Sequence, residues 1–409
     1  MHIGFVNFNT EERKRVSKFM QLLLESTAIE ELGIGRVRDH FSNTLFPGTS
    51  TLQHHAKYFA ILPSLYYDAA YRHKKFDSVQ EVERYIIEAE IQITRQLAEY
   101  ENDTSKVGIT GIDTYKDALK DYKKYVKYNP TYIYGGGMST YGMIPDTSIY
   151  HLIKEISQTH VENPHNKRKW NGEDYTEDAQ ELTGEKQIIL TSGVEYDFFN
   201  GSSMSLDLTP TEADFVKNKI TNSPSCKGTL LSFLLETNGL TLTKDVGYYE
   251  LGEQLDGLDN EVKDIYEKSV LFSKLIHLID WSFNHAYYTS FENEEQSALC
   301  KSEFEKLFEI HKATILDTIK YDSLFEYIHI KDPILTEFCE KCYQKIAKLG
   351  IISLDSLDKL VRERERTVKR ERSKIGNNQY RSKTRNNPGY NEFRWSTVRT
   401  MVDEIRNPK

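Results

Sequence analysis

The residues best suited to chemistry in this chain are basic and aromatic side chains near its C-terminus. Between residues 369 and 394 there are eight basic side chains and two acidic ones. Cations that pair with phosphates, interleaved with rings that stack on bases, are typical of a segment that contacts nucleic acid. The predicted contact residues are Lys369, Arg370, Arg372, Lys374, Arg381, Lys383, Arg385, Arg394, Tyr380, Tyr390 and Trp395. A tail that docks on the acidic remainder of the chain or on a protein partner explains the same residues equally well.

A second candidate is a corner between two helices near the N-terminus. Residues 35–45 are expected to form a short helix, FPGTS a turn of about four residues, and the sequence from Ser50 a second helix with a kink or break at Pro63. This pattern fits the helix-turn-helix template. The side chains that the second helix would present to phosphates or base edges are those of Thr51, Gln53, His54 and Lys57. An ordinary corner of two helices is the simpler interpretation, because the region is not strongly basic.

Other patterns do not specify a reaction. Cys339 and Cys342 form a CxxC without a second ligand pair, so we expect them to pack within a helix. Gly135–Gly137 match neither the P-loop nor the dinucleotide fingerprint, and a flexible turn is expected there. His151 and Glu155 share a helix face without an HExxH pattern or an identified third ligand. We therefore expect no metal and no cofactor, and the catalytic residues of any enzyme are not identifiable.

The charge of the chain is unevenly distributed. The net charge of the 409 residues is −9, whereas residues 361–409 contain 14 basic and 6 acidic side chains, a balance of +8. The first 360 residues therefore carry −17. Such an acidic part is not expected to wrap a duplex, while the basic end suits an anionic partner. No secretory signal or membrane span is expected, and four scattered cysteines favour a reducing cytoplasm.

The periodicity of the chain predicts a mainly α fold with minor β, built as a multi-helix protein of two to three subdomains. The clearest helix follows Ser78, which forms a capping box with Glu81, and residues 101–130 also look helical. Short strands are expected at 2–8 and 187–199. The expected division is an N-terminal helical domain at 1–159, a polar insertion at 160–200, a helical domain at 201–376 and a basic tail with a closing helix at 377–409.

Several segments resemble a bacterial family of uncharacterised proteins, domain of unknown function 6361. They are ELGIGRVRDHFSNTLFPGTST, IYGGGMSTYGM, LTPTEADFVKNKI, SKLIHLIDWSFNHAYY and FRWSTVRTMVDEI, with FPGTST the most specific. The family has no assigned activity, so the resemblance implies no catalytic residue. It does imply a role in bacterial defence islands, near helicases and phospholipase-D-like nucleases.

These observations lead to one function hypothesis and two alternatives. The first is a non-enzymatic accessory subunit of an anti-phage system, which binds DNA or RNA, a helicase or nuclease partner, or both. The alternatives are a metal-dependent nuclease built from scattered His and carboxylates, and a scaffold that binds protein alone.

Overall fold

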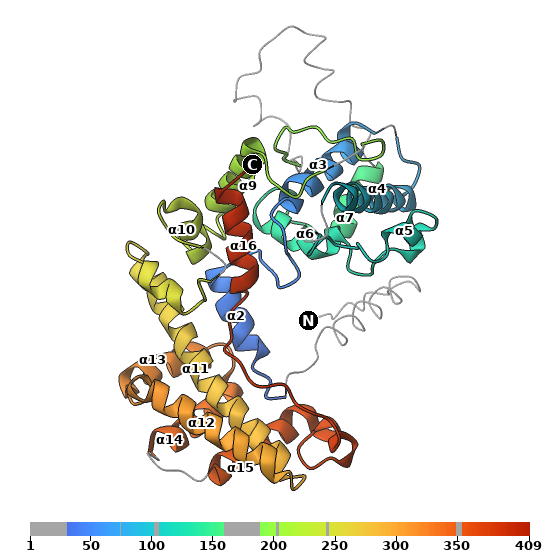
Figure 1. Cartoon of the computed structure of the whole chain (residues 1–409). Coiled ribbons are helices and arrows are strands. Elements are labelled where there is room, and N and C mark those ends of the chain that lie inside the picture. The colour runs from blue at the N-terminus through green and yellow to red at the C-terminus, as the bar shows by residue number, and fades with distance from the viewer. Residues whose placement is uncertain are drawn as a thin grey trace, which may run out of the picture. The chain divides into compact units, whose positions relative to one another are not determined.

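The structure, a computed structural model, describes residues 31–73, 75–101, 106–158, 189–201, 204–242, 245–348 and 354–409. Every regular element within these ranges is a helix (Figure 1), which confirms the expected mainly α class. The strand expected at 2–8 lies outside the described residues. In the part of the chain that is described, no helix has both the length and the apolar character needed to cross a membrane.

The strand or hairpin expected at 187–199 is wrong, because residues 189–199 run as coil and turn. The Asp197 carboxylate accepts from the backbone N–H of Asn200 at 2.8 Å. The amide of Gln96 donates to the carbonyls of Asp197 and Phe198. Side chains therefore satisfy backbone groups that a partner strand would otherwise pair with.

The chain forms two compact units that are discontinuous in sequence. Unit 1 comprises residues 1–41 and 266–391, and unit 2 comprises residues 42–265 and 392–409, each described only over the ranges given above. The division differs from the consecutive domains expected from sequence, because the last helix joins unit 2 rather than forming a tail. Two of the three boundaries fall inside α2 (Gly35–Leu45) and α11 (Asn260–Thr289), and the third falls between residues 391 and 392, just before the last helix.

Unit 2 is a cluster of helices around aromatic side chains. Its described helices are α3 (Tyr58–Tyr71), α4 (Val79–Tyr100), α5 (Tyr115–Ala118), η1 (Tyr122–Lys124), α6 (Pro130–Thr140), α7 (Ile149–Gln158), α9 (Pro210–Asn222), α10 (Leu230–Glu236), η3 (Glu250–Gln254) and α16 (Trp395–Arg406). α16, red in Figure 1, confirms the expected closing helix and packs against α9 and α10. The ring of Trp395 lies 6.3 Å from that of Phe46. The carboxylate of Glu404 binds the ring of His55 at 2.7 Å.

Local signals explain where α4 begins. The Ser78 hydroxyl accepts from the N–H of Glu81 at 3.2 Å, as expected for an N-cap. The Glu81 carboxylate accepts from the N–H of Asp77 rather than from that of Ser78. The predicted helix is therefore confirmed, with a shifted form of the capping box. The helix expected over 101–130 is wrong, because α5, η1 and turns occupy most of this stretch.

The turn expected at Gly135–Gly137 is also wrong, because the three glycines lie inside α6. Gly lowers helix stability by about 1 kcal/mol relative to Ala, so tertiary packing must outweigh local preference here. A Cβ at position 137 would lie 2.6 Å from the carbonyl oxygen of Gly48 and 2.8 Å from the ring of Phe59. The close approach of two backbone segments therefore requires Gly137.

Two alanine substitutions in α6 are expected to have opposite effects on stability. Gly137→Ala should lower the free energy of unfolding by about 1–3 kcal/mol, because the new methyl group overlaps backbone. A methyl group at Gly136 would meet no atom within 4 Å apart from its chain neighbours and the backbone of its own helix, so Gly136→Ala should raise stability by about 0.5–1 kcal/mol. Urea denaturation of both variants checks this, and equal effects would contradict the packing explanation.

Unit 1 is built from the longest helix and the helices that follow it. It contains the part of α11 after residue 265, α12 (Glu294–Ile315), α13 (Thr318–His329), α14 (Pro333–Lys348), α15 (Asp355–Lys369), η4 (Arg370–Arg372) and η5 (Asn378–Tyr380). Tyr321 and Tyr343 stack at 4.3 Å between α13 and α14. Cys339 and Cys342 are fully buried in α14, which confirms that they pack within a helix.

Candidate nucleic-acid interface

Most of the predicted basic segment belongs to unit 1, where it follows α15 and folds back on it. The buried carboxylate of Glu365 accepts from the backbone N–H of Lys374 at 2.6 Å and from that of Ile375 at 3.1 Å. The N–H of Gly376 donates to the Ser290 hydroxyl of the α11–α12 turn at 2.9 Å. The segment is therefore an ordered part of unit 1.

The turn after α15 is strained at Arg370. This residue has φ 52° and ψ −121°, a conformation that glycine adopts far more easily than arginine. Such a conformation costs on the order of 1–3 kcal/mol and often marks a functional site. Arg370 is exposed, so its side chain gains no packing that offsets the strain.

Glu31 holds two of the predicted contact residues. Its carboxylate binds the ammonium of Lys374 and lies 3.3 Å from the guanidinium of Arg385. Burial opposes ionisation, but the hydrogen bond from Lys374 and the charge of Arg385 outweigh it and lower the pKa of Glu31 to about 2. Lys374 and Arg385 therefore have an internal counterion.

Arg385 is also fixed by α11. Its Nε donates to the Asn284 side chain at 2.5 Å, and its guanidinium lies 4.4 Å from the centre of the Phe283 ring. The hydroxyl of Tyr287 donates to the carbonyls of Tyr380 and Lys383. These contacts give Arg385 a structural role and fix the backbone on both sides of Arg381.

Four basic side chains of the segment remain exposed: Arg370, Arg372, Arg381 and Lys383. Lys369 and Tyr380 are half-buried, and the ammonium of Lys383 lies 5.1 Å from the centre of the Tyr380 ring. Tyr390 is 37% exposed, and its hydroxyl pairs with the His311 ring at 2.6 Å. The predicted cations thus separate into an exposed group and a group that holds the fold together. The four exposed cations are called the unit 1 basic surface below.

The last two residues of the predicted segment belong to unit 2. Arg394 donates to the Asn43 side chain at 2.8 Å and to the Thr49 carbonyl at 2.6 Å. Trp395 is 1% exposed, and its indole N–H donates to the carbonyl of Val246 at 2.9 Å. The burial of Trp395 rules out base stacking in this structure, so its prediction as a contact residue is wrong.

The helix-turn-helix expectation at the N-terminal corner is wrong in its geometry. Residues 35–45 form α2 as predicted, but α3 begins at Tyr58, so residues 46–57 form a twelve-residue connection instead of a short turn. Thr51 and His54 are exposed in this connection. Gln53 is 1% exposed and donates to the carbonyls of Gly48 and Ile133, so it stabilises the connection and faces no solvent.

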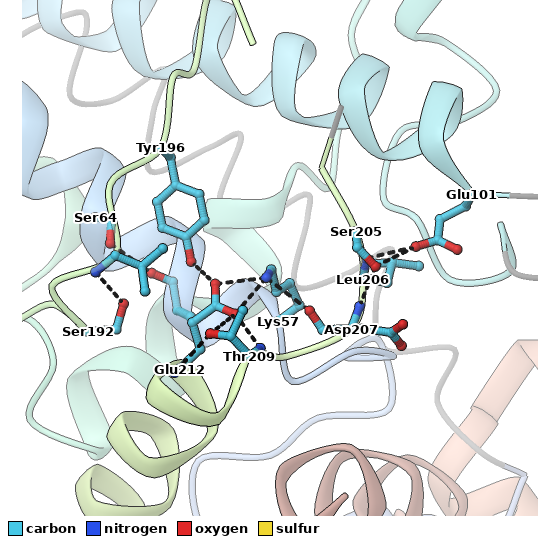
Figure 2. A network of polar contacts seen from close by, with 12 residues as sticks. Lys57, Ser64, Glu101, Ser192, Tyr196, Ser205, Leu206, Asp207, Thr209 and Glu212 are labelled. Atoms are coloured by element: carbon cyan, nitrogen blue, oxygen red, sulfur yellow. Dashed lines mark hydrogen bonds and ion pairs between the residues drawn. The ribbon is translucent and has the colours of Figure 1, made fainter. Parts of the chain in front are cut away.

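Lys57 is buried in a polar network (Figure 2) and is not available to a phosphate. Its ammonium binds both carboxylate oxygens of Glu212 at 2.7 Å and the Asp207 carbonyl at 3.0 Å. The Tyr196 hydroxyl donates to the same carboxylate, and the N–H of Thr209 donates to it at 2.7 Å. Glu212 also completes the capping box of α9. The prediction of Lys57 as a contact residue is therefore wrong.

No group of three or more His, Cys, Asp or Glu side chains suited to a metal ion occurs among the residues that the structure describes. His151 and Glu155 therefore gain no third ligand within those ranges. Among the predicted site residues, the described geometry brings together a basic surface on unit 1.

The comparisons with known proteins concern the N-terminal part of the chain, which contains FPGTST and α2 to α6. Residues 1–153 match the model of DUF6361, a family of unknown function. The expected family resemblance is confirmed over this range. The chain has no significant match among curated proteins or solved structures. The DUF6361 range covers Thr51, Gln53, His54 and Lys57, whereas residues 369–395 lie beyond it.

Proposed function

We propose that this protein binds nucleic acid through the unit 1 basic surface, as a non-enzymatic accessory subunit of a bacterial anti-phage system. The observation that supports binding is the exposure of Arg370, Arg372, Arg381 and Lys383 on a backbone fixed by Glu365 and Tyr287. Ordered cations release counterions from phosphates without a large cost of ordering the loop. The accessory role is supported by the resemblance to DUF6361 and by the −17 charge of the first 360 residues, which suits a protein partner better than a duplex.

The test of binding must keep the whole chain, because removal of residues after Gly376 would delete α16 and its buried side chains, among them Trp395 and Val398. The variant replaces the four exposed cations by Gln: R370Q/R372Q/R381Q/K383Q. Fluorescence polarisation with labelled single-stranded and duplex DNA and RNA should show a loss of affinity of roughly tenfold or more at low salt. The slope of log K against log salt should also fall, by up to about 3 for a single strand.

A matched control removes the same charge from the same unit. Lys301, Lys320, Lys331 and Lys345 are exposed on or beside α12–α14, and their replacement by Gln should leave affinity nearly unchanged. Wild-type protein that binds none of the four probes at low salt would refute the proposal, as would equal losses in the two quadruple variants.

The accessory role has its own experiment. Tagged protein should retain a helicase or nuclease encoded beside its gene, and should do so after treatment with DNase and RNase. Retention that depends on nucleic acid would instead support independent binding to the same strand. No retention under either condition would contradict the accessory role and leave the binding proposal standing.

The strain at Arg370 gives a prediction that separates stability from binding. Arg370→Gly should raise the free energy of unfolding by about 0.5–1 kcal/mol, because glycine relieves the positive φ. It should lower nucleic-acid affinity roughly two- to tenfold, because a phosphate contact is lost. Arg372 has no positive φ, so Arg372→Gly should lower both quantities. Denaturation and polarisation measurements on the two variants check this, and a destabilised Arg370→Gly would contradict it.

A further inference from the structure

Unit 2 carries a second basic and aromatic surface, formed by residues 115–132. This stretch contains five lysines and two aspartates, a balance of +3 within the otherwise acidic part of the chain. All five lysines are exposed: Lys116, Lys120, Lys123, Lys124 and Lys127. The ammonium groups of Lys116, Lys120, Lys123 and Lys124 form no ion pair with a carboxylate in the described ranges. These charges are therefore available to an external anion.

The backbone that carries these lysines is held against α4. The hydroxyl of Tyr125 lies 2.7 Å from that of Thr94, which itself donates to the carbonyl of Thr110. Ala118 is 2% exposed, and the Asp121 carboxylate accepts from the N–H of Lys123 at 3.2 Å. Inward-facing residues thus alternate with the outward-facing lysines. A ligand would not have to order this segment, which lowers the entropic cost of binding.

One exposed and one half-buried aromatic ring lie at the end of the same stretch. Tyr132 is 49% exposed in the first turn of α6, and its ring lies 4.9 Å from that of half-buried Tyr128. The ammonium of Lys127 lies 5.6 Å from the centre of the Tyr128 ring. A tyrosine ring with this exposure beside lysines provides a face on which an unpaired base stacks.

The N-terminus of α6 does not itself offer an anion site. The Glu90 carboxylate accepts from the N–H of Thr131 at 2.7 Å, and the Asn129 side chain accepts from that of Tyr132 at 2.9 Å. The lysine side chains are therefore the groups of this stretch that are available to phosphates. Lysines for the backbone and tyrosines for the bases match the chemistry of a single strand better than that of a duplex, whose bases are stacked on each other.

We infer that residues 115–132 bind single-stranded nucleic acid, with Lys120, Lys123 and Lys124 on the phosphates and Tyr132 stacked on a base. This surface belongs to unit 2 alone, so the inference does not depend on the binding proposed for unit 1. An anionic membrane would also attract the lysines, but it would have no base to stack on Tyr132.

The experiment uses the full chain with the unit 1 basic surface already neutralised, so that the remaining binding reports on unit 2. K120Q/K123Q/K124Q should lower affinity for labelled oligo(dT) of twenty nucleotides roughly fivefold or more, and reduce the salt slope by about 2. The matched control K75Q/K154Q/K227Q removes three exposed lysines from the same unit and should change neither quantity.

Two tyrosine variants separate stacking from charge. Tyr132→Ala should weaken oligo(dT) binding roughly fivefold or more, whereas Tyr132→Phe, which keeps the ring, should bind as the parent does. Neither should alter binding to a duplex of the same length.

The inference is overturned if K120Q/K123Q/K124Q binds oligo(dT) like its control, or if the Ala and Phe variants are indistinguishable. It is also overturned if the lysines matter only for phosphatidylserine vesicles. If only neutralisation of the unit 1 basic surface abolishes binding, the first proposal is supported and this inference is refuted. If only K120Q/K123Q/K124Q abolishes binding, this inference is supported and the first proposal is refuted.

Discussion

Replacing Glu212 by Gln is expected to destabilise unit 2 by about 3–5 kcal/mol. The substitution leaves the Lys57 ammonium buried with the Asp207 carbonyl but without its counterion. Breaking a buried ion pair from one side is costly because the remaining charge has lost its hydration without compensation. Urea denaturation followed by peptide-resolved hydrogen exchange would assign the loss to unit 2 rather than to the whole chain.

The partner substitution is expected to cost less. In Lys57→Met the Glu212 carboxylate keeps hydrogen bonds from the Tyr196 hydroxyl and from the backbone and hydroxyl of Thr209, so a loss of about 2–3 kcal/mol is expected. The double variant K57M/E212Q should be more stable than the sum of the single losses predicts, by about 2 kcal/mol or more. Additive losses would show that the pair does not interact as the structure indicates.

The same variants test the corrected role of Lys57. Because the ammonium is buried, Lys57→Met should bind nucleic acid with the affinity of the parent protein at a temperature where both are folded. A large loss of affinity in a folded Lys57→Met variant would restore the contact role expected from sequence.

The elements that sequence predicts well are those whose ends are set by neighbouring residues. The helix over 35–45 is bounded by Gly33 and by Pro47–Gly48, and α14 begins at Pro333, where the missing N–H of proline costs nothing. The stripe of apolar residues after Ser78 likewise fixes α4. In these places the chain contains the whole signal within about one turn of the helix end.

The elements that sequence mispredicts depend on distant residues. The carbonyl of Gly48 packs against Gly137 across 89 positions, and this contact keeps a run of glycines helical against its local preference. The residues next to Lys57 in sequence predict an exposed side chain. Its burial depends on the ion pair with Glu212, which lies 155 positions away. The division into units is equally non-local, since each unit joins two separated stretches of chain.

The candidate site shows the same limit. The sequence identifies the basic residues of 369–395, but it does not separate exposed Arg372 from Arg385, whose charge is compensated by Glu31. The interleaved lysines and tyrosines of 115–132 suggest only a helical stretch when they are read in sequence. Their alternation with buried Ala118 and half-buried Tyr125 could have indicated a surface, but the identity of the inward-facing residues becomes clear only from their packing on α4.

Replacing Glu31 by Gln is expected to lower the stability of unit 1 and to raise its affinity for nucleic acid. The folded-state pKa of Glu31, about 2, lies below its ordinary value of 4.5. The stabilisation is therefore fully present above about pH 4.5 and is lost as the pH falls through 2. Because the pair is partly exposed, solvent screening reduces its contribution to about 1–2 kcal/mol at neutral pH. Removal of the carboxylate also leaves Lys374 and Arg385 without that counterion, so roughly a threefold gain in affinity is expected.

Glu371→Gln is the matched control, since it removes an exposed carboxylate from the same segment. Both variants should gain affinity, because each makes the segment more positive by one charge. Only Glu31→Gln should lose stability, and the difference from wild type should shrink as urea denaturation is repeated from pH 6 down to pH 2.5. A stability loss in Glu31→Gln that stays constant over this range would show that the ion pair is not its cause. A loss of affinity in Glu31→Gln with a gain in Glu371→Gln would instead show that Glu31 positions the unit 1 basic surface more than it neutralises the segment.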